Sequence, residues 1–175
     1  MTYIVISIGS NFGNRIASLQ YAVNELGNSV CNLSPVFETT PWGESKQELF
    51  LNAIVIANNP NLNSYDWLKE GKRIERESGR KKNKRWGLRT LDVDLIVSYN
   101  INRKMLCCDT KNLVLPHLLT HMRAFVLIPW LAINSNIHLK IMDHMYSTYS
   151  LVKGINTTEK NNIKQTNLVL NYPES

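Results

Sequence analysis

The sequence has few of the residues that mark secreted, membrane-spanning or linker-like chains. It holds three cysteines, with Cys107 and Cys108 adjacent and no C-x-x-C spacing, which favours reduced thiols over disulfides or a zinc site. Eight glycines and six prolines are too few for a linker-like chain. No apolar run reaches the roughly 18 residues that span a bilayer, and residues 1–10 lack the basic segment of a signal peptide. These absences predict a cytoplasmic protein with no membrane partner.

Apolar residues make up 43% of the 175 residues, enough to fill the core of one domain. We expect that domain over residues 1–149, followed by a tail over 150–175 that has the composition of a mobile segment, with one strand at 168–170. Strands are predicted over 3–8, 30–40, 50–57, 91–99 and 104–107, and helices over 14–26, 63–78 and 120–133. The leading β-α-β-β-α-β order predicts a ferredoxin-like α+β fold, with helices packed on a mostly antiparallel sheet.

The net charge of +6 comes from a single segment. Residues 69–89 contain ten of the twenty Lys and Arg and only three acids, a local charge of +7. Within it, residues 79–89 combine Arg and Lys with one aromatic, Trp86. Such a loop binds nucleotide phosphates, binds nucleic acid with the aromatic as a stacking platform, or is simply solvated. By itself, the segment leaves all three interpretations open.

A pair of acids interrupts the most strand-like segment, residues 91–97. On a strand, Asp92 and Asp94 point to the same face, while the apolar residues that alternate with them point to the other. Two close carboxylates repel unless a cation neutralises them, and Mg²⁺ prefers carboxylate oxygens while keeping coordination positions for phosphates. The alternative is an edge strand with two solvated acids, although Asp is disfavoured in strands. The pair predicts a magnesium site, and its position after the basic loop favours nucleotide phosphates over nucleic acid.

Two further segments carry weaker signals. In the first, an aromatic and an amide share one strand face, which suits a flat ring that forms hydrogen bonds. The second adds a histidine, a cation and another aromatic. The residues concerned are Thr39, Thr40, Phe50 and Asn52 in the first segment, and His117, Arg123 and Phe125 in the second. Each segment alone is equally consistent with turns and core packing.

Together these segments resemble the 6-hydroxymethyl-7,8-dihydropterin pyrophosphokinases of folate biosynthesis. The resemblance runs from residue 6 to Phe125, about two thirds of the chain. It is most specific over residues 85–95, Arg-Trp-Gly-Leu-Arg-Thr-Leu-Asp-Val-Asp-Leu. It implies a ferredoxin-like fold and the transfer of pyrophosphate from ATP to the pterin hydroxymethyl group, giving the pterin diphosphate and AMP.

The resemblance also implies a role for each matching residue. The catalytic residues would be Arg80, Arg89, Asp92 and Asp94, with the two aspartates holding two Mg²⁺ ions that accompany ATP. The residues that position ATP would be Glu75, Lys82, Trp86 and His117. The pterin-binding residues would be Thr39, Thr40, Phe50, Asn52, Arg123 and Phe125, with the ring between the two phenylalanines and its edge bonded to the amide. The expected state is a monomer without a nucleic-acid partner.

Two other functions are weighed against this one. A small RNA-binding module would use the basic loop and Trp86, but it leaves Asp92 and Asp94 unexplained, because acids beside a phosphate-binding strip repel nucleic acid. A catalytically inactive pterin-binding relative would not need both aspartates together with Arg80 and Arg89.

Overall fold

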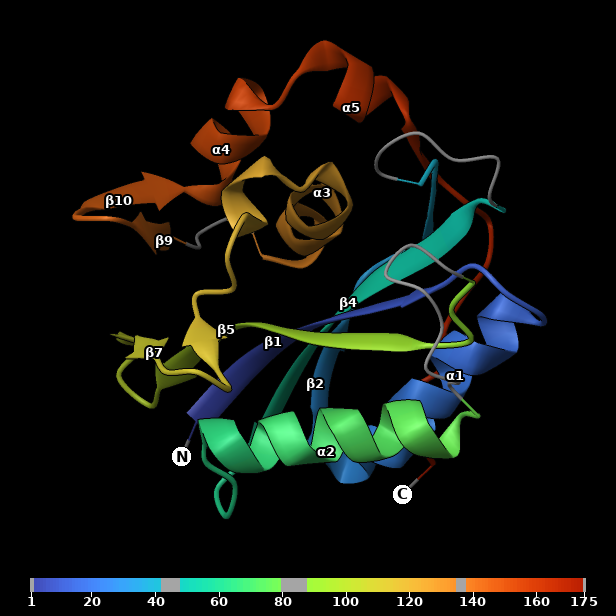
Figure 1. Cartoon of the computed structure of the whole chain (residues 1–175), viewed down its shortest axis with the longest axis horizontal. Helices are drawn as coiled ribbons and strands as arrows, with labels where there is room; N and C mark the ends of the chain where they lie inside the picture. The colour runs from blue at the N-terminus through green and yellow to red at the C-terminus, as the bar shows by residue number, and fades with distance from the viewer. Residues whose placement is uncertain (1, 42–47, 80–87, 135–137, 175) are drawn as a thin grey trace.

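One antiparallel sheet forms the centre of the molecule. The computed structural model describes residues 2–41, 48–79, 88–134 and 138–174 (Figure 1). Among these, seven strands form the sheet in the order β11-β3-β4-β1-β5-β6, with β2 also paired to β4. Their bounds are β1 Thr2–Ser10, β2 Val30–Leu33, β3 Phe37–Thr39, β4 Phe50–Asn59, β5 Asp92–Asn100, β6 Met105–Leu106 and β11 Ile163–Gln165. Two hairpins lie apart: β7 Cys108–Asp109 with β8 Val114–Leu115, and β9 His138–Ile141 with β10 His144–Ser147.

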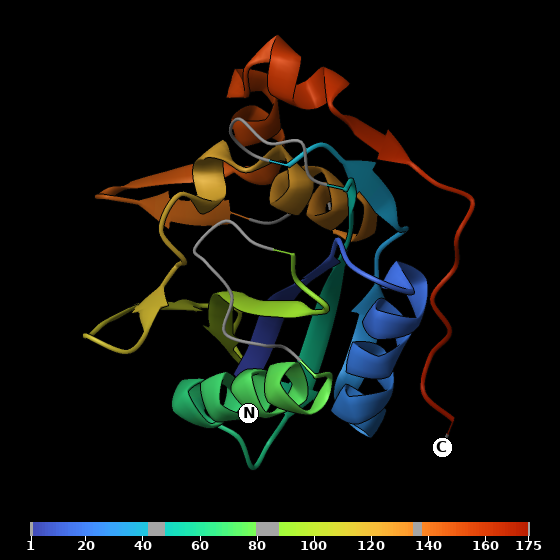
Figure 2. The ribbon, with the colours of Figure 1, turned by 45° about the vertical axis from the view of Figure 1, so that its right-hand side comes forward.

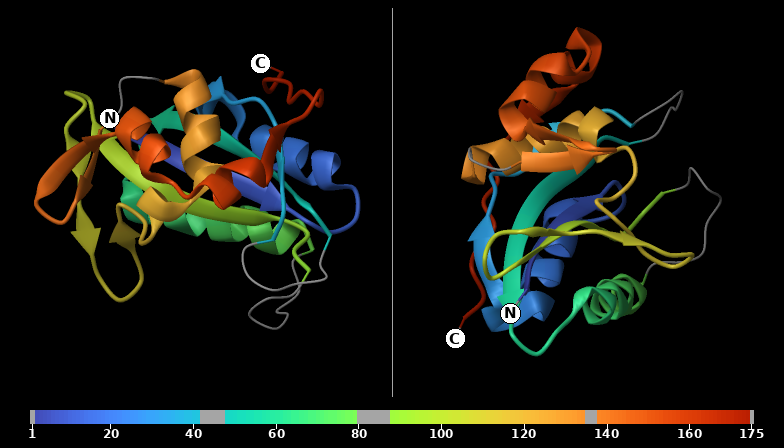
Figure 3. Two further views of the ribbon diagram at one scale, coloured as in Figure 1. Left: turned by 90° about the horizontal axis from the view of Figure 1, so that it is seen from above. Right: turned by 90° about the vertical axis from the view of Figure 1, so that its left-hand side faces the viewer.

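Helices cover both faces of the sheet (Figures 1 and 3). Helix α1 Arg15–Leu26 and helix α2 Ser64–Glu77 lie on one face, and α3 Ala124–Ile133 with α4 Thr148–Gly154 lies on the other. The alternation of β1 shows both cores: Ile4, Ile6 and Ile8 belong to the cluster beneath α1 and α2, whereas Val5 belongs to the cluster beneath α3. The order β1-α1-β2/β3-β4-α2-β5 confirms the predicted ferredoxin-like α+β fold.

The helix ends follow the local sequence. Asn14 caps α1 by accepting a hydrogen bond from Ala17 N, and Gly27 ends the helix with a φ of 53°, a conformation that glycine adopts without strain. Asn63 caps α2 in a reciprocal arrangement with Asp66. The predicted bounds of both helices are therefore confirmed to within a residue or two.

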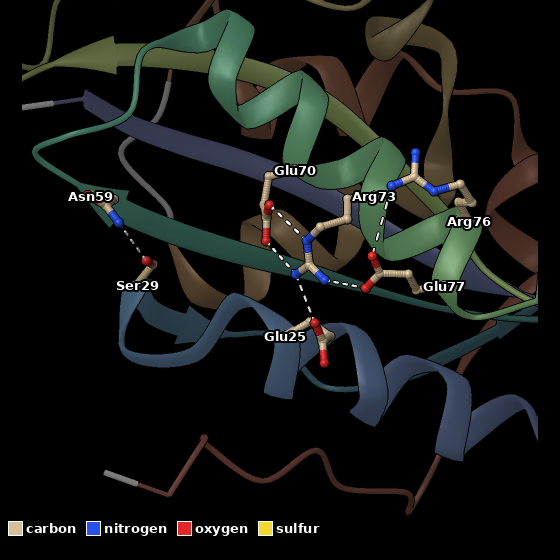
Figure 4. A network of polar contacts seen from close by, with 7 residues as sticks. All are labelled: Glu25, Ser29, Asn59, Glu70, Arg73, Arg76 and Glu77. Atoms are coloured by element: carbon tan, nitrogen blue, oxygen red, sulfur yellow. Dashed lines mark hydrogen bonds and ion pairs between the residues drawn. The ribbon is translucent and has the colours of Figure 1, made fainter.

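Helices α1 and α2 are joined by a charged network centred on Arg73 (Figure 4). Its guanidinium lies 2.8 Å from Glu25 of α1 and 2.6 Å from Glu70 of α2, and it also pairs with Glu77. These acids raise the pKa of Arg73 still further, chiefly because its guanidinium donates hydrogen bonds to Glu70 and Glu25. The network fixes the helices side by side on the sheet.

The strand predicted over 30–40 is divided into β2 and β3. At Ser34 the hydroxyl accepts from Ile54 N at 2.8 Å, and the Ser34 amide donates to Ile54 O at 2.9 Å, so a side chain replaces part of the regular ladder before Pro35. The helix predicted over 120–133 begins only at Ala124, after a 3₁₀ turn over Thr120–Met122, and it contains Pro129.

The C-terminal segment runs around the sheet edge to the opposite face. Helix α4 spans the boundary predicted at residue 149, and α5 Thr157–Asn161 leads into β11, which pairs with β3. The chain then descends alongside α1 (Figure 2). The strand predicted at 168–170 is wrong: Leu170 is buried and Val169 is exposed, but the backbone there pairs with no strand among the described residues. Residues 168–170 have the apolar composition of a strand but pair with no strand among the described residues. Strand β11 is polar in sequence, and it is a strand because it pairs with β3.

Candidate functional site

A row of residues crosses four strands at one end of the sheet. Antiparallel pairing places Phe37 of β3 opposite Asn52 of β4, Asn52 opposite Gly9 of β1, and Gly9 opposite Asp92 of β5. Directly opposed residues share a face, so all of these positions belong to the α3 face of the sheet. The next row joins Ser7 to Asp94. The predicted acids and the predicted amide therefore lie on one face, separated by a glycine.

The two acids stand among cations from other elements. Asp92 pairs with the Arg89 guanidinium, and Asp94 Oδ2 lies 3.8 Å from Arg123 Nη1. Burial raises the pKa of Asp94, and the charge of Asp92 raises it further, while His117, Lys72 and Arg123 oppose that shift. Among the described residues, the combined effect of these groups is thus a raised pKa of Asp94.

Asn11 fixes the backbone that carries Arg89. The Asn11 side chain is buried, and its Oδ1 accepts a hydrogen bond from the backbone N–H of Arg89 at 2.7 Å. The backbone N–H of Asn11 donates to the carbonyl oxygen of Arg89 at 3.1 Å. The segment that leads into β5 is thereby held against the end of β1. Sequence reasoning missed Asn11 as a functional position, although a polar residue directly after a buried strand was a usable signal.

Glu75 lies on α2 and is 4% exposed. Its Oε1 accepts from Val93 N at 2.9 Å, and its Oε2 accepts from Lys72 Nζ at 2.9 Å. Val93 stands between the two aspartates on β5, so Glu75 holds the strand at the point where the acids project. The structure gives Glu75 this bond to the backbone, and its predicted contact with ATP stays a prediction.

A β-bulge positions His117. The register of β1 with β5 passes from Ile6–Leu95 to Val5–Val97, so Ile96 is an extra residue on β5. The carbonyl of Ile96 accepts from His117 N at 2.7 Å. The ring Nδ1 lies 2.6 Å from Leu118 O, which places its proton on Nδ1 and makes Nε2 an acceptor in the neutral ring.

Arg123 and Phe125 lie at the start of α3, Arg123 as its N-cap and Phe125 in its first turn. The Arg123 guanidinium carbon lies 5.6 Å from the centroid of the Phe125 ring, at cation–π distance. Arg123 Nε is buried and has no hydrogen-bond partner among the described residues. A buried donor without a partner is costly, so this atom is suited to an incoming acceptor.

The opposite end of the row is a buried amide held in one orientation. Asn52 Nδ2 donates to Thr39 Oγ1 at 2.8 Å, and both side chains are buried. Asn52 Oδ1 lies over Gly9, where an added Cβ would come within 2.9 Å of it and 3.8 Å from Phe50 Cδ1. The predicted shared face of Phe50 and Asn52 is confirmed. The sequence did not reveal the role of Gly9, because a side chain at this position is excluded only by Asn52 of the neighbouring strand β4.

Part of the predicted site lies outside the described residues. These positions are Arg80, Lys82 and Trp86 of the basic loop. Thr40 lies at the exposed end of the described segment after β3, where its amide donates to Asn162 O at 3.3 Å.

A family comparison identifies this arrangement. The model of the family 7,8-dihydro-6-hydroxymethylpterin-pyrophosphokinase (HPPK) matches residues 5–135. The chain belongs to this family. The resemblance inferred from separated motifs is therefore confirmed, and with it the pyrophosphokinase class of enzyme.

Members of this pyrophosphokinase family are similar in sequence to most of this chain. A 2-amino-4-hydroxy-6-hydroxymethyldihydropteridine pyrophosphokinase of Mycobacterium leprae is 43% identical over 100% of this chain and 94% of its own length. The enzyme of that name from Bacillus subtilis is 36% identical over 71% of this chain and 73% of its own length. The crystal structure of wild-type Plasmodium falciparum HPPK-DHPS matches with a TM-score of 0.67 at 14% identity, over 94% of this chain and 46% of that one. This chain spans less than half of that protein, and the likeness concerns the fold alone.

Within the described residues, no helix is long and apolar enough to cross a membrane. The same residues contain no cluster of three or more His, Cys, Asp or Glu side chains arranged to hold a metal ion.

Proposed function

We propose that this pyrophosphokinase transfers pyrophosphate from ATP to the hydroxymethyl group of 6-hydroxymethyl-7,8-dihydropterin, giving the pterin diphosphate and AMP. The observation that carries the proposal is the row of Asn52, Gly9 and Asp92 across the sheet. It sets an oriented amide, suited to the edge of a flat heterocycle, beside a carboxylate pair suited to a metal–phosphate complex. The intervening Gly9 lets the Asn52 side chain lie directly over β1, because a Cβ there would come within 2.9 Å of Asn52 Oδ1.

In the reaction, the pterin hydroxyl oxygen bonds to the β-phosphorus of ATP, and the bond from that phosphorus to the oxygen bridging it to the α-phosphate breaks. The hydroxyl loses its proton and AMP leaves. Such transfers depend on positioning and charge neutralisation rather than on covalent chemistry by the protein. Arg89 would bind phosphate oxygens, because it already stands beside Asp92. Arg80 is proposed for the same task. Arg123, predicted as a pterin-binding residue, would offer its buried Nε, which has no described partner.

Asp92 and Asp94 would hold two Mg²⁺ ions together with the ATP phosphates. The two residues fit this role, since they are hard oxygen ligands on one strand face and the pKa of Asp94 is raised in the absence of a further cation. Bound Mg²⁺ supplies charge neutralisation and orientation of the phosphates. Glu75 acts beneath the pair by holding Val93 between the two acids.

The substrates would occupy the two ends of the row. The pterin edge would bond to Asn52, with Thr39 and Thr40 lining the pocket and the ring between Phe50 and Phe125. ATP would lie on the side of His117, with Glu75, Lys82 and Trp86 completing its site. We propose a monomer without nucleic-acid or membrane partners.

The test is AMP formation from Mg²⁺, ATP and 6-hydroxymethyl-7,8-dihydropterin, followed by chromatography. AMP that depends on the pterin and disappears with EDTA is the expected result. Formation of ADP, or no product from folded protein, would refute the transferase. Salt-sensitive RNA binding in the same preparation would then favour the RNA-binding alternative.

A further inference from the structure

We propose that the C-terminal strand β11 is a positioning element of the pterin pocket, acting through β3 on Thr39 and Asn52. The identity of the ligand rests on the proposed function, whereas the mechanical linkage rests on contacts within the chain. Strand β11 lies beyond residue 135, where the family match ends. The residues that identify the family therefore do not include this segment.

Strand β3 is short and depends on pairing along both edges. It has only three residues and pairs with β4 on one side and β11 on the other. Beyond the ladder, Thr40 N donates to Asn162 O at 3.3 Å and Thr166 N donates to Val36 O at 2.9 Å. Without β11, β3 would be a three-residue edge strand with unpaired backbone groups, which favours fraying.

The pairing leads directly to the buried amide. Ile163 of β11 lies opposite Thr39, and it packs against the apolar cluster beneath α3. Thr39 Oγ1 accepts the 2.8 Å hydrogen bond from Asn52 Nδ2, and Asn52 Oδ1 lies over Gly9. A shift of β3 therefore moves the only acceptor that the structure gives to the Asn52 amide nitrogen among the described residues.

The chain on both sides of β11 is anchored independently. Before it, Ile155 is buried beneath α3. After it, Leu170 enters the cluster beneath α1, and Gln20 of α1 exchanges two hydrogen bonds with the backbone of Asn171, at 3.0 and 2.9 Å. Figure 2 shows the segment passing from α5 along the sheet edge to α1. These anchors set the register in which β11 meets β3.

A matched pair of proline substitutions tests the linkage. Hydrogen bonding alternates along an antiparallel ladder, and the flanking bonds of Thr40 and Thr166 make Glu38 and Lys164 the pair that exchanges both backbone bonds. Lys164→Pro removes an N–H that faces β3. Gln165→Pro removes the next N–H, which faces away from β3, so it controls for proline in this exposed strand.

For Lys164→Pro we expect the KM for the pterin to rise at least about fivefold, as loss of a net hydrogen bond predicts, with the KM for ATP within about twofold of wild type. Amide exchange at Glu38 and Thr40, which donate to β11, should accelerate at least about tenfold. Gln165→Pro should leave all three quantities near wild type. A purely structural role would reduce the amount of active enzyme without separating the two KM values.

Unchanged pterin KM in Lys164→Pro despite faster exchange would overturn the proposal, as would an equal rise in both proline variants. If Lys164→Pro does not fold, Thr166→Val replaces it, because that variant removes only the 3.0 Å bond from Thr166 Oγ1 to Val36 O and its acceptance from Leu168 N. A smaller rise in pterin KM is then expected, and none would count against the linkage. Failure of the proposed function is distinguished by wild-type protein that makes no pterin-dependent AMP while the exchange results still hold.

Discussion

Replacement of Gly9 by alanine should weaken pterin binding while leaving the fold nearly intact. The added Cβ would lie 2.9 Å from Asn52 Oδ1, closer than such contacts occur, so the amide must move. Movement costs the Asn52–Thr39 hydrogen bond, worth about 1 kcal/mol, and misplaces the group that recognises the ligand. We expect the KM for the pterin to rise about tenfold, which corresponds to roughly 1.4 kcal/mol.

Steady-state kinetics with both substrates, together with denaturant unfolding, measure this effect. The double variant Gly9→Ala with Asn52→Ala is the informative control, because the alanine at 52 removes the atom with which the new Cβ collides. Gly9→Ala should then add little to the loss caused by Asn52→Ala alone, whereas independent effects would add. A wild-type pterin KM in Gly9→Ala, or full additivity in the cycle, would refute the steric reasoning.

Asp94→Asn should reduce turnover at least about 100-fold with pterin binding preserved, which titration of the bound pterin can measure. The same variant should be more stable than wild type in metal-free buffer at pH 7. Because the pKa of Asp94 is raised in the folded state, the wild-type protein loses folding stability as the pH rises above the pKa of this group in the unfolded chain. Asparagine does not ionise, so the variant does not lose this stability. The advantage should disappear at acid pH, and denaturant unfolding at both pH values will decide. Arg73→Ala should cost about 1–2 kcal/mol of unfolding free energy by leaving the acids of both helices uncompensated, while Arg76→Ala, whose exposed partner lies at 3.9 Å, should change it by less than about 0.5 kcal/mol.

The parts of the fold that local sequence determines were predictable. Helices α1 and α2 lie where the apolar spacing predicted them, with Asn14 and Asn63 as their caps, and the alternation of β5 placed Asp92 and Asp94 on one face. The features that local sequence patterns did not predict depend on pairing between segments that are distant in the sequence. Strand β11 is polar and is a strand only because β3 lies beside it.

The site shows the same division between local and distant information. The two acids lie two residues apart in the sequence, but the groups that oppose the raised pKa of Asp94 come from separate elements: Lys72 from α2, His117 from the segment after β8, and Arg123 from the turn before α3. The bulge at Ile96 brings His117 to β5, and no composition or spacing signal predicts it. Folding therefore brings these groups to Asp94 from three separate elements, and among the described residues their combined effect still leaves the pKa of Asp94 raised by burial and by the charge of Asp92.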